Sequence, residues 1–243
     1  MPAIVGPNTA RIVPGNARDL NFVDANTVDI VLTDPPYYDN VAYSELSDFF
    51  QPWLSELGLV PKPGIRRTAI RGALRAARSD DASIESFAAE LGEAFSEIHR
   101  VLKPKGLLAF TFRHSTPNAW LAMGKALAKS QLRPIQVLPL PGEAGSGLHT
   151  HGGTSLWDAV LVFRKIDCKS PQETLTHQQI ESARTSSRQW RERFRRQDRV
   201  PFNVADYVNL FRASLVAASL GLFGKSGAEQ TPLGTALNEA DPK

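Results

Sequence analysis

The stretch that decides the fold is VDIVLTDPPY, residues 28–37. Its first six residues are mostly apolar and β-branched, which is typical of a strand buried on both faces of a parallel sheet. Two prolines follow shortly afterwards, and each fixes φ and removes a backbone N–H donor. The sequence therefore predicts a buried strand over residues 28–33 that leads directly into a turn beginning at Asp34.

Strands and helices are predicted to alternate on both sides of this segment. Apolar runs at 10–13, 106–112, 135–140 and 159–163 predict further strands, and amphipathic spacing predicts helices over 46–57, 84–102 and 118–129. The alternation indicates an α/β fold in which helices flank a parallel sheet. Residues 1–166 would form this domain. Residues 167–243 would form an Arg-rich helical extension, with a polar helix within 167–200 and an apolar helix over 206–222.

The composition is that of an ordinary folded domain, because 42% of the 243 residues are hydrophobic and 22% are charged. The single cysteine, Cys168, cannot form an internal disulfide or a zinc site alone, so a reducing compartment and no metal site are expected. No apolar run approaches the roughly 20 residues that cross a bilayer, and residues 1–10 do not resemble an export signal. We therefore expect a cytoplasmic protein with no membrane partner.

Positive charge is concentrated in two segments. Residues 66–78 contain five arginines and no acid, and residues 184–199 contain seven arginines with Glu192 and Asp198, so each segment carries +5. Since the whole chain carries +3, the remainder carries −7. Two basic segments on an acidic body are typical of a protein that binds a polyanion such as nucleic acid. The arginines also recur at helical spacing, so solvated helix faces are the alternative interpretation.

The residues after the first strand can hold a planar base. In an open α/β sheet, ligands bind beyond the carboxyl ends of the strands, which is where Asp34 is expected. An exocyclic amino group has two N–H donors, which the Asp34 carboxylate and the Pro35 carbonyl can accept, while Pro36 holds the turn. The Tyr37 ring can stack on the base that carries the amino group. An ordinary turn that ends a strand is the alternative interpretation.

Asp34-Pro35-Pro36-Tyr37 after a buried strand resembles motif IV of the amino-methyltransferases. The longer runs DPPYYDNVAYSELSDFF (34–50) and HRVLKPKGLLAFTFRH (99–114) resemble the large adenine-specific DNA methylases that carry an N-terminal domain of unknown function. The resemblance covers residues 10–166. It implies a partial Rossmann-like methyltransferase sheet, whose parallel strands end in an antiparallel hairpin. It also implies S-adenosyl-L-methionine as cofactor and adenine N6 in DNA as the methyl acceptor.

The same resemblance implies roles for individual residues. The catalytic residues Asp34, Pro35, Pro36 and Tyr37 would hold a base flipped out of duplex DNA. Hydrogen bonds to Asp34 and to the Pro35 carbonyl would restore electron density to the amino nitrogen, which then attacks the sulfonium methyl in line. The residues expected to contact nucleic acid are Tyr38 and Asn40, beside the motif, and the arginines of the basic segment 66–78, namely Arg66, Arg67, Arg71 and Arg75.

The cofactor side of such an enzyme is represented only in part. Residues 15–20 (GNARDL) resemble motif III, which implies that Asn16 and Ala17 meet the cofactor, with Asn16 standing where Asp is usual. The glycine-rich Phe-x-Gly-x-Gly loop of the family has no counterpart before Asn16. The chain is therefore expected to contain strands three to seven of the family's sheet, and a companion chain would supply the strands of the cofactor loop.

Three alternatives remain open at this point. In the first, the chain is a catalytically inactive methylase remnant that binds nucleic acid or a partner protein. In the second, it is an amino-methyltransferase that acts on RNA or on protein. Cytosine instead of adenine is also compatible with the motif.

Aromatic residues at helical spacing follow the motif, namely Tyr43, Phe49, Phe50 and Trp53. They fit either a stacking platform or a buried helix face, and we assign Phe49, Phe50 and Trp53 to the core while Tyr43 stays open. Residues 223–227 lack the preceding strand and the glycine spacing of a cofactor or phosphate loop. The two histidines within 145–153 favour an ordinary loop over a metal site.

Overall fold

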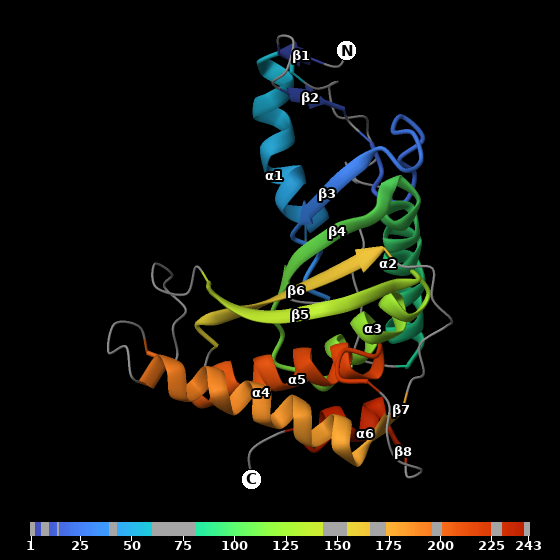
Figure 1. Cartoon of the computed structure of the whole chain (residues 1–243). Coiled ribbons are helices and arrows are strands. Elements are labelled where there is room, and N and C mark those ends of the chain that lie inside the picture. The colour runs from blue at the N-terminus through green and yellow to red at the C-terminus, as the bar shows by residue number, and fades with distance from the viewer. Residues whose placement is uncertain are drawn as a thin grey trace.

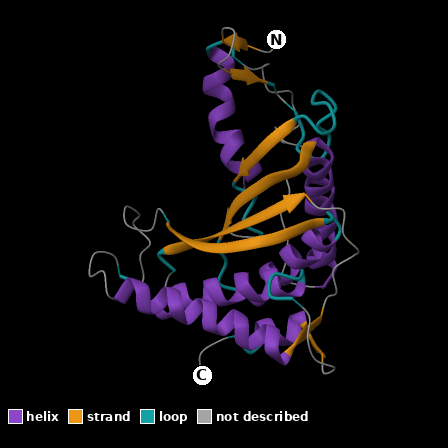
Figure 2. Ribbon diagram, in the orientation of Figure 1, coloured by secondary structure: helices purple, strands orange, loops and turns teal. Residues whose placement is uncertain are grey.

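A computed structural model describes residues 3–5, 10–13, 15–38, 43–59, 81–142, 155–165, 174–195, 201–224 and 230–240. The strands are β1 (Ala3–Val5), β2 (Ala10–Ile12), β3 (Val28–Thr33), β4 (Leu102–Phe112), β5 (Leu132–Pro141), β6 (Trp157–Lys165), β7 (Thr174–Thr176) and β8 (Gln230–Pro232). The helices are α1 (Tyr43–Glu56), α2 (Asp81–Val101), α3 (Pro117–Ala128), α4 (His177–Arg195), α5 (Val204–Ser219) and α6 (Leu233–Asn238). Figures 1 and 2 show β3, β4, β6 and β5 side by side, with α4 and α5 beneath them.

The central sheet has the strand order β3-β4-β6-β5. β3 and β4 are parallel, with Val31 opposite Leu108 and Thr33 opposite Phe110, and β6 runs antiparallel to both β4 and β5. This arrangement confirms the predicted α/β fold, including the antiparallel hairpin of β5 and β6. The strand predicted at residues 10–13 is present as β2, but its expected place in the central sheet is wrong, because β2 pairs with β1 in a separate two-stranded sheet. In the described part of the chain, the central sheet therefore contains four of the five expected strands.

One face of the central sheet is covered by helices. Successive side chains of a strand point to opposite faces, and every second residue of β4 and β6 is buried on this side. These residues are Leu108, Phe110, Phe112, Ala159, Leu161 and Phe163, each at most 1% exposed. Side chains of α2, α3 and α5 belong to the same hydrophobic cluster, and the ring centroids of Phe95 on α2 and Phe110 are 5.4 Å apart. This covered face is the core.

The opposite face is more exposed, above all on β3. Ile30 and Leu32 are 56% and 76% exposed, and the register places them beside the half-buried Leu107 and Ala109 of β4. The prediction that residues 28–33 are buried on both faces is therefore wrong. The apolar run gives the strand two apolar faces, but β3 is an edge strand of the described sheet, and only one of its faces packs against the core.

Helix α1 confirms the predicted helix but corrects the position of its aromatic side chains. Phe49, Phe50 and Trp53 are 66%, 57% and 67% exposed, so their assignment to the core is wrong. The rings of Phe49 and Phe50 contact each other edge to face, with centroids 5.2 Å apart. Helical spacing places these side chains on one face of α1, but spacing alone does not supply an element that covers that face. The side chain of Tyr43 lies outside the described residues.

The C-terminal part contains both expected helices. α4 confirms the polar helix, and α5 confirms the apolar one. At the start of α5, the Asn203 side chain accepts a hydrogen bond from the Asp206 N–H, and the Asp206 carboxylate accepts one from the Asn203 N–H, which is a capping box. α5 is almost entirely buried and belongs to the same hydrophobic cluster as the sheet. The proposed domain boundary at residue 166 lies outside the described residues, so the division into two domains stays a prediction.

Helices long and apolar enough to cross a membrane are absent from the described ranges. Within those ranges there is also no group of three or more His, Cys, Asp or Glu side chains that could hold a metal ion.

Candidate active site

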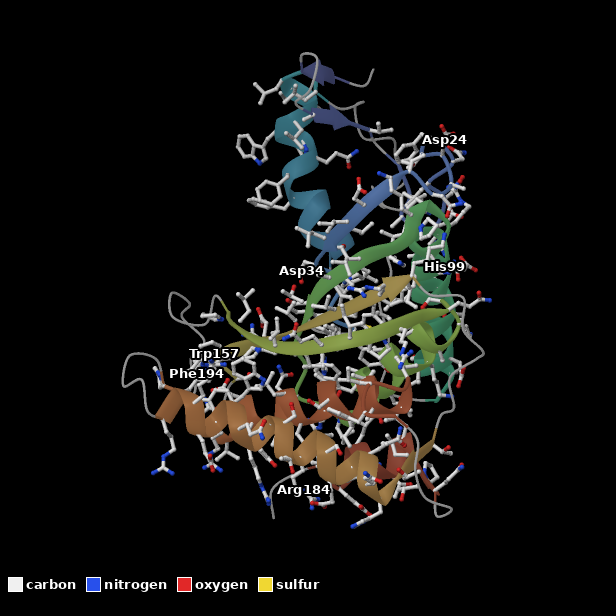
Figure 3. All side chains as sticks on the ribbon, in the orientation of Figure 1. Asp24, Asp34, His99, Trp157, Arg184 and Phe194 are labelled. Atoms are coloured by element: carbon white, nitrogen blue, oxygen red, sulfur yellow. The ribbon has the colours of Figure 1, made fainter. Side chains whose placement is uncertain are left out.

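The candidate site lies at the carboxyl ends of the parallel strands β3 and β4. Asp34 directly follows β3 and its side chain is exposed. Because Thr33 is opposite Phe110, the next residue of β4, Thr111, lies beside Asp34. The Thr111 Oγ1 hydroxyl donates a hydrogen bond of 2.5 Å to Asp34 Oδ1. Figure 3 shows Asp34 at the opposite edge of the sheet from Asp24 and His99.

A second hydroxyl holds the same carboxylate oxygen. Tyr37 Oη donates to Asp34 Oδ1 at 2.9 Å. Pro35 is buried and Pro36 is half-buried between these two residues, and the fixed φ of the prolines helps to hold the geometry. Within the described residues, Asp34 Oδ2 accepts no hydrogen bond, so an exposed acceptor remains on a carboxylate whose other oxygen is fixed.

The Tyr37 ring lies between this carboxylate and the core. Its edge packs against Phe112, with ring centroids 5.7 Å apart and an interplanar angle of 84°. Burial raises the pKa of the Tyr37 hydroxyl well above its ordinary value, and the negative charges of Asp158 and Asp34 act in the same direction. The hydroxyl therefore stays protonated at neutral pH and can donate to Asp34.

An ion pair extends the site along the same edge of the sheet. Arg113 follows β4, and its Nε lies 3.3 Å from Oδ1 of Asp158 at the start of β6. The backbone of Gly142, after β5, passes close to this pair: a Cβ there would lie 2.8 Å from Arg113 Nη1. Glycine therefore allows the chain after β5 to approach the ion pair. Charged and polar groups from three adjacent strands thus meet at the edge where Asp34 lies.

Tyr38 does not take the place expected for it. Its side chain is fully buried, and its ring contacts Phe87 and His114 edge to face at centroid distances of 5.1 and 5.8 Å. Its φ of 54° is in the left-handed region, which turns the chain so that this ring enters the core while Asp34 stays outside. The prediction that Tyr38 contacts nucleic acid is therefore corrected: its ring is part of the core.

The expected cofactor residues lie in a different part of the molecule. Asn16 and Ala17 are exposed on a tight turn in which Asn16 Oδ1 accepts a hydrogen bond from the Arg18 N–H. Arg18 pairs with Glu90 of α2 at 3.0 Å, and the Leu20 N–H donates to Glu97 of the same helix. The contacts of this turn run to α2, so the structure does not join the expected cofactor residues to Asp34. Their role stays a prediction.

Several candidate residues lie outside the described residues. They are Asn40, Arg66, Arg67, Arg71 and Arg75, together with residues 145–153 and 225–227. Their expected roles stay predictions.

Sequence reasoning missed Thr111, Arg113 and Asp158. Each lies at the end or the start of a strand, and a polar residue at such a position was the available signal. Their convergence on Asp34 and Tyr37 depends on the order and register of β3, β4 and β6, which the sequence pattern did not define.

No family model matches this chain, and no curated protein matches it. Solved structures similar to it include three of TTHA0409 from Thermus thermophilus, a protein provisionally described as a DNA modification methylase. One structure is 17% identical, covers 82% of this chain and 72% of that chain, and gives a TM-score of 0.37. A second is 17% identical, covers 84% and 82%, and also gives 0.37. A third, solved with S-adenosyl-L-methionine, is 16% identical, covers 82% and 72%, and gives 0.36.

Proposed function

We propose that this chain carries the base-binding part of a DNA methyltransferase that uses S-adenosyl-L-methionine and methylates the N6 amino group of adenine. The observation that carries the proposal is the Asp34 carboxylate. It is exposed at the carboxyl end of β3, and Tyr37 and Thr111 hold its Oδ1 while Oδ2 stays available as an acceptor. An amino group of a flipped base would donate one N–H to Oδ2.

The chemistry at Asp34 is orientation and electrostatics. A carboxylate that accepts an N–H hydrogen bond shifts the amino nitrogen from planar toward sp³ geometry, which localises its lone pair and raises the electron density on the nitrogen. Tyr37 and Thr111 fix the carboxylate in advance, so little reorganisation is needed when the base arrives. The Pro35 carbonyl would accept the second N–H, and Tyr37 would face the base ring. When bound, the cofactor supplies the electrophilic methyl group.

The cofactor fits the described residues only in part. Asn16 and Ala17, the residues expected to meet it, lie on an exposed turn whose following residues Arg18 and Leu20 contact α2, and no contact in the described ranges joins them to Asp34. β3 is an edge strand of the described sheet, and Ile30 and Leu32 on it are exposed. In the described sheet the outer edge of β3 has no partner, so an additional parallel strand could pair with it, and elements packed on that strand could cover these side chains. We propose that a companion chain supplies this strand together with the cofactor loop.

The test of the function is transfer of labelled methyl groups to duplex DNA, compared with RNA and protein acceptors. Asp34→Ala should lower transfer at least about a hundredfold, the effect of removing one group aimed at the reacting atoms. Its melting temperature should change little, because the side chain is exposed, and its DNA affinity should change little, because phosphate contacts dominate that affinity. The matched control is Asp29→Ala, which removes another exposed carboxylate, one that lies near the start of β3. Full activity of Asp34→Ala, or transfer to RNA or protein instead of DNA, would contradict the proposal.

The test of the companion chain uses calorimetry with S-adenosyl-L-methionine. The lone chain should bind the cofactor weakly, and a polypeptide carrying Phe-x-Gly-x-Gly that is encoded beside this gene should restore binding on co-expression. Leu32→Lys should prevent that restoration, because it places a charge on the surface to be covered. Micromolar binding by the lone chain would refute the need for a companion. A complex that does not bind the cofactor but still binds DNA would instead favour the inactive remnant.

A further inference from the structure

Four arginines form a single stripe along α4. Arg184, Arg188, Arg191 and Arg195 follow one another at intervals of four, three and four residues. At 100° per residue these positions lie within about 60° of one another around the helix. The stripe flanks the side on which α4 packs against α5, where Ala183 and Ser187 are buried.

Aromatic rings of α5 hold two of these arginines. The Arg184 guanidinium lies over the Phe211 ring at 5.5 Å, and the Arg191 guanidinium lies over the Tyr207 ring at 5.9 Å. Such contacts retain the positive charge and restrict the side chain. The stripe is therefore partly ordered along the junction of α4 and α5.

The charge of the stripe is largely uncompensated. Arg184 pairs with Glu181, whereas Arg188, Arg191 and Arg195 are exposed and form no ion pair with a carboxylate in the described ranges. Glu192 follows Arg188 by four residues and precedes Arg195 by three, about 40° and 60° around the helix, so it is the carboxylate nearest to the stripe, but it forms no ion pair with either arginine in the described ranges. A solvated helix face of a stable protein commonly alternates opposite charges, so three consecutive unpaired arginines indicate an anionic partner.

The stripe ends at the sheet edge that carries the candidate site. Phe194 of α4 packs against Trp157 with ring centroids 4.2 Å apart, and Trp157 directly precedes Asp158, whose charge acts on Tyr37. Asp206 fixes this junction, since its buried carboxylate accepts the backbone N–H of Trp157 at 2.9 Å. Figure 3 shows Asp34, Trp157 and Phe194 toward the same side of the sheet, with Arg184 farther along α4.

We propose that this stripe binds the phosphates of duplex DNA whose target base occupies the Asp34 site, an inference that rests on the proposed function. From Arg184 to Arg195 the helix rises about 16 Å, which equals the rise of about five base pairs along one strand. Guanidinium groups form paired hydrogen bonds with phosphate oxygens, and a row of them fits a repeating polyanion better than a single small anion. The stripe would position the duplex beside the site without reading its sequence.

The test measures the affinity for a labelled duplex as a function of salt concentration. The double variant Arg188→Gln with Arg195→Gln removes two charges, leaves the arginines that contact Phe211 and Tyr207, and keeps good helix-forming residues. The slope of log K against log salt should fall in magnitude by about 1.8, or about 0.9 for each lost phosphate contact. Unchanged melting temperature would show that α4 remains folded.

The matched control is Arg133→Gln with Arg164→Gln. These arginines are exposed and lie opposite each other on β5 and β6, at the sheet edge away from Asp34. The control should leave the slope unchanged. Equal changes of the slope in the two double variants would mean that only the net charge of the protein matters, and would overturn the inference. Tighter binding of polyglutamate than of DNA at equal charge would also overturn it.

The inference and the proposed function fail in distinguishable ways. Methyl transfer with an unaltered salt slope in the α4 variant would keep the function and refute the stripe. The opposite outcome would be a salt slope that still depends on the stripe arginines in the Asp34→Ala background, together with no methyl transfer by the wild-type complex. That outcome would support DNA binding by the stripe and refute the proposed function.

Discussion

β3 and β4 are adjacent parallel strands of similar apolar character, but they differ sharply in burial. On β4, Leu108 and Phe112 are fully buried, whereas on β3, Ile30 and Leu32 are 56% and 76% exposed. β4 has a strand on each side and β3 has a strand on only one side in the described sheet. The difference teaches that an apolar strand sequence reports which faces can be buried, while its neighbours determine which faces are buried.

The largest effect should come from the buried strand. Leu108→Ala should lower the free energy of unfolding by about 2–5 kcal/mol, since it removes apolar atoms from a closely packed interior and leaves a cavity. Urea denaturation followed by circular dichroism measures the change. A loss below about 1 kcal/mol would mean that the covered face of the sheet is not closely packed.

A smaller, pH-dependent effect should come from Tyr37, which lies at the boundary between the core and the open edge. Its folded-state pKa is raised above the ordinary value of 10.0, so its contribution to stability is fully present below that pH and is lost as the pH rises through the folded-state pKa. The stability of the wild type should therefore fall more steeply above about pH 10 than that of Tyr37→Phe.

Chemical denaturation of both proteins over the alkaline range measures this difference. If the free energies of unfolding of the two proteins changed with pH in parallel, the Tyr37 hydroxyl would be solvated as it is in an unfolded chain. Thr111→Val offers a second comparison, because it removes the other hydroxyl that donates to Asp34 Oδ1, and the threonine hydroxyl does not ionise in this pH range.

The smallest effect should come from the exposed strand. Leu32→Ala, the same substitution as at Leu108, should change the free energy of unfolding by no more than about 0.5 kcal/mol in the lone chain. The same denaturation experiment measures it. A larger loss would show that Leu32 is covered in solution, for example by association with another copy of the chain.

The pattern of apolar residues was sufficient to predict most elements of the central sheet. Alternating and continuous runs located β3, β4, β5 and β6, and helical spacing located α2, α3 and α5, because each such element must bury a periodic face. The same reasoning located a strand at residues 10–13, seen as β2 (Ala10–Ile12), but not its sheet, because a three-residue strand carries no information about its partner.

The candidate site was predicted in part. A carboxylate after a strand that ends in two prolines located Asp34, and its exposure at the sheet edge agrees with the predicted placement. Thr111 and Asp158 were missed because they lie 77 and 124 positions away from Asp34 in the sequence, and only the order of the strands brings them near.

The sequence by itself determined the α/β alternation, the sharp end of β3 and the position of Asp34 after it, because these depend on local periodicity and on the backbone restrictions of proline. Only the tertiary structure decided that Tyr38 enters the core while Tyr37 holds Asp34, and that one face of β3 stays exposed. These outcomes depend on strand register and on which elements pack together. Both arise from contacts between residues distant in the chain, which local pattern does not encode.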